Sequence, residues 1–200
     1  MTQAPTSVTL TADGTTLELP TVQATEGSSG FVVSSLLSQT GLTTLDPGFM
    51  NTASCESKIT FIDGDEGILR YRGYPIEQLA EESSFLEVAY LLIHGELPSK
   101  DEFEAFAERI NRHTLVHENF RTFMGTFPTG AHPMAVLSSA VNALATFYPE
   151  SLDPFDPEAV ELATVLILAK VRTITSFLHR TQTGEPLLYP DYSRGYVEDF

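Results

Sequence analysis

The sequence contains no tryptophan, a single cysteine and few basic residues. Because Cys55 is the only cysteine, no disulfide can form within the chain, and the cysteine usage gives no indication of an oxidising compartment. Eleven lysines and arginines stand against 27 aspartates and glutamates, which gives a formal net charge of −16. Proteins bind nucleic-acid phosphates and anionic membranes through lysine and arginine, so this charge argues against both kinds of partner.

The sequence also lacks a long hydrophobic run. Its longest stretch without a formal charge, residues 122–149, is interrupted by glycines and prolines, and only residues 134–148 remain as an uninterrupted apolar segment. This segment is shorter than the roughly 20 residues that span a bilayer as a helix. The first residues lack the basic and apolar regions of a secretory signal. We therefore expect a soluble, cytoplasmic protein.

The hydrophobic residues make up 42% of the chain, with thirteen phenylalanines, which is enough to bury a core. Residues 1–73 are predicted to form a β-rich entrance segment with one short helix. Asp13 and Gly14 mark a hairpin turn between two β-prone runs, and residues 63–67 mark a second turn. The strands are predicted at residues 8–11, 15–19, 58–62 and 68–71, and the helix at residues 31–37, closed by Gly41.

Residues 74–200 are predicted to be helical. Ser84 with Glu87, and Ser99 with Glu102, each match a capping box, in which a serine hydroxyl and a glutamate carboxylate bind free N–H groups at the start of a helix. The second box precedes an apolar stripe at i, i+3, i+4 and i+7. Further helices are predicted at residues 134–148 and 157–183. The first of these carries no charge and many small residues, so we expect it to be buried on most sides.

Residue patterns that mark a calcium or phosphate site are incomplete. A calcium loop beginning at Asp63 needs glycine and glutamate at positions six and twelve, where the chain has Ile68 and Tyr74. Residues 125–130 have the glycines of a phosphate loop but lack the lysine that follows them. The sequence therefore predicts no bound cofactor.

Two histidines have the spacing of zinc ligands on a helix. His113 and His117 stand four residues apart, but no third ligand has a supporting motif. Continuing the apolar stripe of the preceding helix places His117 on its buried face. We interpret His117 as a satisfied or partner-contacting histidine and predict no metal site.

Several motifs in one order resemble the N-terminal portion of bacterial, type II citrate synthases. The principal block is SCESKITFIDGDEGILRYRGYPI at residues 54–76. Other matching segments lie at residues 45–49, 77–80, 91–98, 112–114, 132–135 and 189–190. The resemblance covers nearly the whole chain from about Gly41. It implies a mainly α fold, part of the large helical domain of citrate synthase, with a small N-terminal β-rich segment.

The resemblance implies an acyltransferase of the tricarboxylic acid cycle. In this family acetyl-CoA condenses with oxaloacetate, and the citryl-CoA formed is hydrolysed to citrate and CoA, by general acid–base and electrostatic catalysis without a metal or cofactor. Family members are about twice this length, and the matching catalytic residues lie beyond Phe200. The chain is therefore expected to be an inactive fragment of a homo-oligomeric enzyme, a dimer or a hexamer.

The resemblance also implies an allosteric NADH site at Arg112, His113, Thr114 and Lys170. Basic side chains at these positions suit the phosphates of a dinucleotide. One turn before Lys170, where those enzymes carry an arginine, this chain has Leu166. We therefore predict weak or no control by NADH. The alternative, in which these residues lie on a helix surface or contact another subunit, stays open.

Two alternatives concern the reaction as a whole. A 2-methylcitrate synthase, which uses propionyl-CoA, is the nearest relative in reaction type, and its acyl selectivity lies in a pocket outside these residues. A non-catalytic interaction module that keeps the N-terminal half of the family is the other. A reading frame that continues past codon 200 favours the enzyme, and a stop codon there favours the module.

Overall fold

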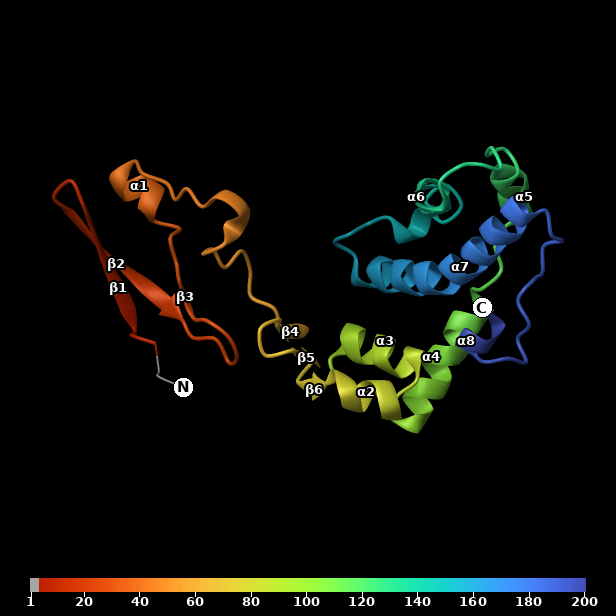
Figure 1. Cartoon of the computed structure of the whole chain (residues 1–200), viewed down its shortest axis with the longest axis horizontal. Helices are drawn as coiled ribbons and strands as arrows, with labels where there is room; N and C mark the ends of the chain where they lie inside the picture. The colour runs from red at the N-terminus through yellow and green to blue at the C-terminus, as the bar shows by residue number, and fades with distance from the viewer. Residues whose placement is uncertain (1–3) are drawn as a thin grey trace. The chain divides into compact units, whose positions relative to one another are not determined.

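The computed structural model describes residues 4–200 and divides into two compact units (Figure 1). The first unit ends at Glu82 and the second is Ser83–Phe200. All six strands of the described residues belong to the first unit, whereas the long helices belong to the second. No helix within residues 4–200 is long and apolar enough to cross a bilayer. The division of the chain at residues 73 and 74 stays a prediction.

The first unit begins with the predicted hairpin. Strand β1 (Ser7–Ala12) pairs antiparallel with β2 (Thr15–Val22), so that Leu10 lies opposite Leu17. Asp13 and Gly14 have φ angles of 47° and 78°, the left-handed conformations that a two-residue hairpin turn requires. The expected turn is therefore confirmed.

The helix predicted at residues 31–37 is wrong at its start. Phe31 belongs to β3 (Gly30–Phe31), which pairs with the end of β2, and helix α1 is limited to Leu36–Thr40. Gly41 ends α1 with a φ of 72°, as expected. The hydrophobic run alone could not distinguish strand from helix, because the β2 edge that accepts Phe31 lies earlier in the chain.

A second small sheet completes the first unit. Strands β4 (Thr60–Asp63) and β5 (Ile68–Tyr71) form the second predicted hairpin, and β6 (Tyr74–Pro75) leads into helix α2 (Ile76–Glu82). In the turn, Oδ1 of Asp63 accepts hydrogen bonds from the backbone N–H groups of the second and third residues after it. This carboxylate therefore serves the turn, as the sequence indicated. A short 3-10 helix, η1, covers Pro47–Phe49.

In the second unit, both predicted capping boxes are present. Helix α3 (Phe85–His94) begins at Ser84 and α4 (Lys100–Arg112) begins at Ser99, and in each the serine and the glutamate bind one another's backbone N–H groups. Gly95 ends α3 with a φ of 96°. The apolar stripe of α4 packs against α3 and the long helix α7 (Pro157–Thr183) through a cluster that contains Leu86, Phe106, Ile110, Val165 and Ala169.

Replacing Ser99 with alanine is expected to destabilise the second unit by about 1 kcal/mol, because the first turn of α4 loses its cap. The matched control is Ser138→Ala, the same change on the exposed face of a helix, where alanine has the higher propensity and the effect is neutral or slightly stabilising. Urea unfolding followed by far-UV circular dichroism measures both. Equal stabilities of the two variants would contradict the prediction.

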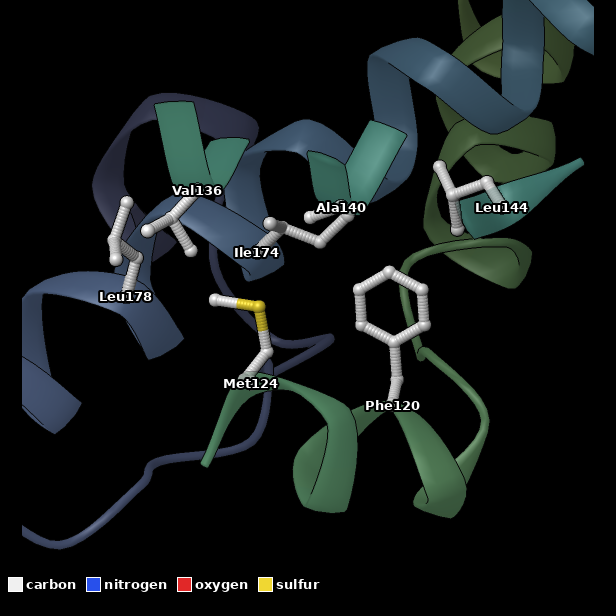
Figure 2. Close-up of a cluster of buried hydrophobic side chains, with 7 residues drawn as sticks. All are labelled: Phe120, Met124, Val136, Ala140, Leu144, Ile174 and Leu178. Atoms are coloured by element: carbon white, nitrogen blue, oxygen red, sulfur yellow. The ribbon is translucent and has the colours of Figure 1, made fainter. Parts of the chain in front are cut away.

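The remaining helices surround α7 (Pro157–Thr183), which begins at the Asp156 cap and ends at Gly184, as predicted. Helices α5 (Glu118–Met124) and α6 (Pro133–Leu144) pack against its C-terminal half. Figure 2 shows their side chains converging on a common core. Its members are Phe120, Met124, Val136, Ala140, Leu144, Ile174 and Leu178. A 3-10 turn, η2 (Pro149–Ser151), precedes α7, and α8 (Tyr196–Asp199) follows it.

Helix α6 differs from its prediction in two ways. It ends at Leu144 rather than Tyr148, because the next residues form tighter i to i+3 hydrogen bonds before Pro149. Within the described chain it is also buried on one face only, through Val136, Ala140 and Leu144, whereas Met134 is 62% exposed. The expectation of burial on most sides is therefore wrong for these residues.

Candidate functional site

The side chain of Lys170 lies in the interior of the second unit, with 1% of its surface exposed. Its ammonium donates hydrogen bonds to the backbone carbonyl oxygens of His113, at 2.7 Å, and Leu115, at 2.6 Å. These carbonyls belong to the connection between α4 and α5. Lys170 therefore attaches this connection to the middle of α7.

The charge of Lys170 has no acidic partner within residues 4–200, since none of their carboxylates lies at ion-pair distance from it. The face of the Tyr148 ring lies 4.7 Å from Nζ, in a cation–π arrangement. Burial lowers the pKa of Lys170 from 10.5 to about 8. Carbonyl dipoles and a ring face thus stabilise a buried ammonium in place of a carboxylate.

His113 and Thr114 lie beside this ammonium. His113 is the residue that follows α4, and its pKa is lowered by burial and by the positive charges of Lys170 and Arg109. At neutral pH this places His113 in its uncharged form. Thr114 is fully buried, and its hydroxyl donates to the carbonyl of Ile110 at 3.1 Å.

Arg112 does not join this cluster. It is the last residue of α4, its side chain is 72% exposed, and it pairs with Glu108 one turn earlier in the same helix. Leu166, one turn before Lys170, is buried in α7. The structure thus brings together three of the four residues expected at the effector site, and the ammonium among them is bonded to the protein's own backbone.

Sequence reasoning missed the role of two neighbouring α7 residues. Arg172 is 5% exposed, and its guanidinium reaches the hydroxyl of Thr114 and the backbone of Tyr196. The hydroxyl of Thr173 donates to the carbonyl of Thr114 at 2.9 Å. A basic residue within an otherwise apolar part of a long helix was the available signal, because such a residue is rarely buried without a partner.

The histidines that were considered as zinc ligands serve as structural residues. Because α4 ends at Arg112, His117 does not continue its apolar stripe, so its expected place on the buried face of that helix is wrong, whereas its interpretation as a satisfied histidine agrees with its contacts. His117 instead begins α5, where its Nδ1 accepts from the backbone N–H of Asn119 and its ring contacts Phe147. Within the described part of the chain, no three histidines, cysteines or acidic residues are grouped as a metal site would require.

The surface of the second unit also carries an open apolar groove of about 410 Å³ between α3 and α7. No ionisable side chain lines it. Its lining residues are Phe85, Val88, Ala89, Leu92, Ile93, Thr164, Ile167 and Leu168. The groove therefore offers apolar contact and no group for acid–base chemistry.

Comparisons with known proteins agree on one family. Residues 48–200 match the family model described as "Citrate synthase, C-terminal domain". The chain is 53% identical over 194 residues to citrate synthase 1 of Mycobacterium tuberculosis and 49% identical over 187 residues to citrate synthase of Corynebacterium glutamicum. These alignments cover 97% and 94% of this chain but 45% and 43% of the two relatives. The chain thus spans less than half the length of the curated relatives it matches.

Solved structures agree with this result. Citrate synthase from Pyrobaculum aerophilum superposes with a TM-score of 0.68 at 30% identity, over 76% of this chain and 40% of that one. The Thermotoga maritima enzyme gives 0.65 at 27% identity, over 78% and 40%. The Thermoplasma acidophilum enzyme, solved as a ternary complex with carboxymethyl coenzyme A and oxaloacetate, gives 0.70 at 24% identity, over 78% and 41%.

The similarity to the Thermoplasma acidophilum structure shows a common fold only. The family model and the bacterial relatives match the amino-acid sequence itself. The predicted fold class, a mainly helical citrate synthase fold with a small N-terminal β-rich segment, is confirmed. The resemblance carried by the motifs is confirmed as well. The chain belongs to the citrate synthase family.

Proposed function

We propose that the enzyme containing this chain condenses acetyl-CoA with oxaloacetate and water to give citrate and CoA. The observation that carries this proposal is the 53% identity to citrate synthase 1 of Mycobacterium tuberculosis, which extends over 97% of the chain. The reaction needs positioned acids and bases and no resident metal or cofactor.

The described residues supply the scaffold of this enzyme. Helix α7 is buried along its middle and holds α4, α5 and α6 around it, so the second unit has its own core. We propose that the first part of the large domain is built on this core and that the catalytic residues follow it in the chain. The enzyme is proposed to act in the cytoplasm as a homo-oligomer, a dimer or a hexamer.

The test uses the protein encoded by the complete reading frame. Incubated with acetyl-CoA and oxaloacetate, it is expected to release CoA, which a thiol reagent detects. Propionyl-CoA is the comparison substrate, because a 2-methylcitrate synthase would turn it over with the higher kcat/KM. Higher kcat/KM for propionyl-CoA would replace the proposed substrate, and release from neither would overturn the proposed reaction.

We further propose that NADH has little or no effect on the complete enzyme. Lys170 is bonded to two backbone carbonyls, Arg112 pairs with Glu108, and Leu166 contributes no charge near them. A dinucleotide phosphate would have to displace these contacts. The expected result is a citrate synthase rate changed less than twofold by NADH. Strong inhibition that Lys170→Ala abolishes would establish the effector site instead.

A further inference from the structure

The guanidinium of Arg172 joins two segments that lie far apart in the sequence. It is buried in α7, with 5% of the residue exposed. Nη1 donates to the backbone carbonyl of Tyr196 at 2.8 Å, and Nη2 donates to the hydroxyl of Thr114 at 3.2 Å. Thr114 precedes Arg172 by 58 residues, and Tyr196 follows it by 24.

On one side, Arg172 holds helix α8. The carboxylate of Asp199 lies 3.3 Å from Nη2, and its side chain is 9% exposed. The ring of Tyr196 lies 4.6 Å from the guanidinium carbon, and its hydroxyl donates to the carbonyl of Leu168 at 2.7 Å. The same ring stacks on Phe85 of α3 at a centroid distance of 5.0 Å. Arg172 therefore holds α8 through an ion pair, a backbone hydrogen bond and a ring contact, and Tyr196 adds contacts to Leu168 and Phe85.

On the other side, Arg172 holds the connection between α4 and α5, residues 113–117. Thr114 is fully buried, and its hydroxyl both donates to Ile110 and accepts from Arg172. Its carbonyl accepts from Thr173, the next residue of α7. If the contact to Arg172 is lost, the buried Thr114 hydroxyl has one hydrogen-bond partner fewer. This loss destabilises the closed state of residues 113–117.

The two sides share a single group. The same nitrogen, Nη2, contacts both Thr114 and Asp199, and Nε of Arg172 has no hydrogen-bond partner within the described residues. The contacts to both segments therefore depend on the position of the same guanidinium nitrogen. The guanidinium is planar and rigid, so a shift of the group on one side also moves its contacts on the other side. A lysine ammonium, on a flexible side chain, would adjust to such a shift.

We propose that Arg172 couples residues 113–117 to α8, so that the two segments open and close as one cooperative unit. Thermodynamic linkage then makes the effect reciprocal, because contacts that hold one segment closed also stabilise the other. The coupling is a property of this chain's own packing and does not depend on the proposed condensation reaction. It gives Arg172 a positioning role rather than a catalytic one.

Hydrogen exchange of the folded 200-residue chain, read by mass spectrometry, tests this proposal. Asp199→Asn removes the charge on the α8 side and is expected to raise exchange within residues 113–117 about tenfold. Thr114→Val removes the hydroxyl on the other side and is expected to raise exchange in residues 196–199 by a similar factor. The exchange rates of the double variant are expected to be only slightly higher than those of the more affected single variant, because both substitutions disrupt the same cooperative unit.

Two control variants distinguish coupling between the two segments from a general loss of stability. Thr114→Ser keeps the hydroxyl and is expected to leave both segments as in the unsubstituted chain. Arg180→Met removes an α7 guanidinium that contacts Glu185 and Pro186 and reaches neither segment, so both should again be unchanged. Circular dichroism confirms that each variant is folded. Faster exchange confined to the substituted side in both single variants would overturn the proposal.

Discussion

The 200-residue chain by itself is expected to release no CoA from acetyl-CoA and oxaloacetate. The condensation needs a positioned base for the methyl proton and donors for the developing negative charge. The groove between α3 and α7 has no ionisable lining residue. The buried cations Lys170 and Arg172 are bonded to backbone carbonyls of the protein. General acid–base catalysis contributes roughly 10²–10⁴-fold by itself, and neither this groove nor these two cations provides a free group for it.

The measurement is thiol release over time, with the complete enzyme as the positive control. Cys55 is exposed and reacts with the thiol reagent itself, so up to one equivalent of signal comes from the protein. The matched control is Cys55→Ser, which removes that signal and leaves any turnover unchanged. Release of several equivalents of CoA by this variant would show that the described residues contain a working site.

Replacing Lys170 with methionine is expected to remove a pH dependence from the stability of the second unit. Burial lowers the pKa of Lys170 from 10.5 to about 8, so between these values the unfolded chain holds a proton that the folded chain has released. Stability rises with pH in this window, because the unfolded state binds more protons. The rise between pH 7 and pH 9.5 amounts to about 2 kcal/mol.

At pH 7 alone, the effect of Lys170→Met combines two opposing changes. The carbonyls of His113 and Leu115 lose their donor, at a cost of about 1–3 kcal/mol for each buried acceptor. Methionine also removes a buried charge whose ionisation costs about 3 kcal/mol, from the same lowered pKa. The pH dependence isolates the second change from the first.

Urea unfolding at several pH values, followed by far-UV circular dichroism, gives the free energy of unfolding for both proteins. The difference between the unsubstituted chain and Lys170→Met is the informative quantity, because tyrosines and other groups that titrate in both proteins largely cancel. Lys100→Met is the matched control, since the Lys100 side chain is 84% exposed and its loss should leave the slope unchanged. Parallel pH profiles for the unsubstituted chain and Lys170→Met would contradict the prediction.

The candidate site shows how far sequence reasoning reached. The resemblance grouped His113, Thr114 and Lys170, and the structure places them side by side. It also grouped Arg112, which lies exposed at the end of α4 and pairs with Glu108. The effector role of all four residues remains a prediction. Spacing on a helix could indicate which residues share a face, but the bonding of Lys170 to carbonyls 57 and 55 residues earlier had no local signal.

The sequence by itself determined the elements that depend on neighbouring residues. The capping boxes at Ser84 and Ser99, the turn at Asp13 and Gly14, and the end of α7 at Gly184 all rest on contacts within a few residues or on a left-handed backbone. The residues that specify each of these features are therefore neighbours in the sequence.

Only the tertiary structure decided the features whose partners lie elsewhere in the chain. Phe31 became a strand because β2 offered an edge, and α6 is covered on one face because α5 and α7 reach only that side within the described residues. Lys170 and Arg172 became attachment points because folding brought the α4–α5 connection to α7, and α8 to Arg172. A buried cation takes whichever acceptors the packing places near it, so its role follows from the fold rather than from its position in the sequence.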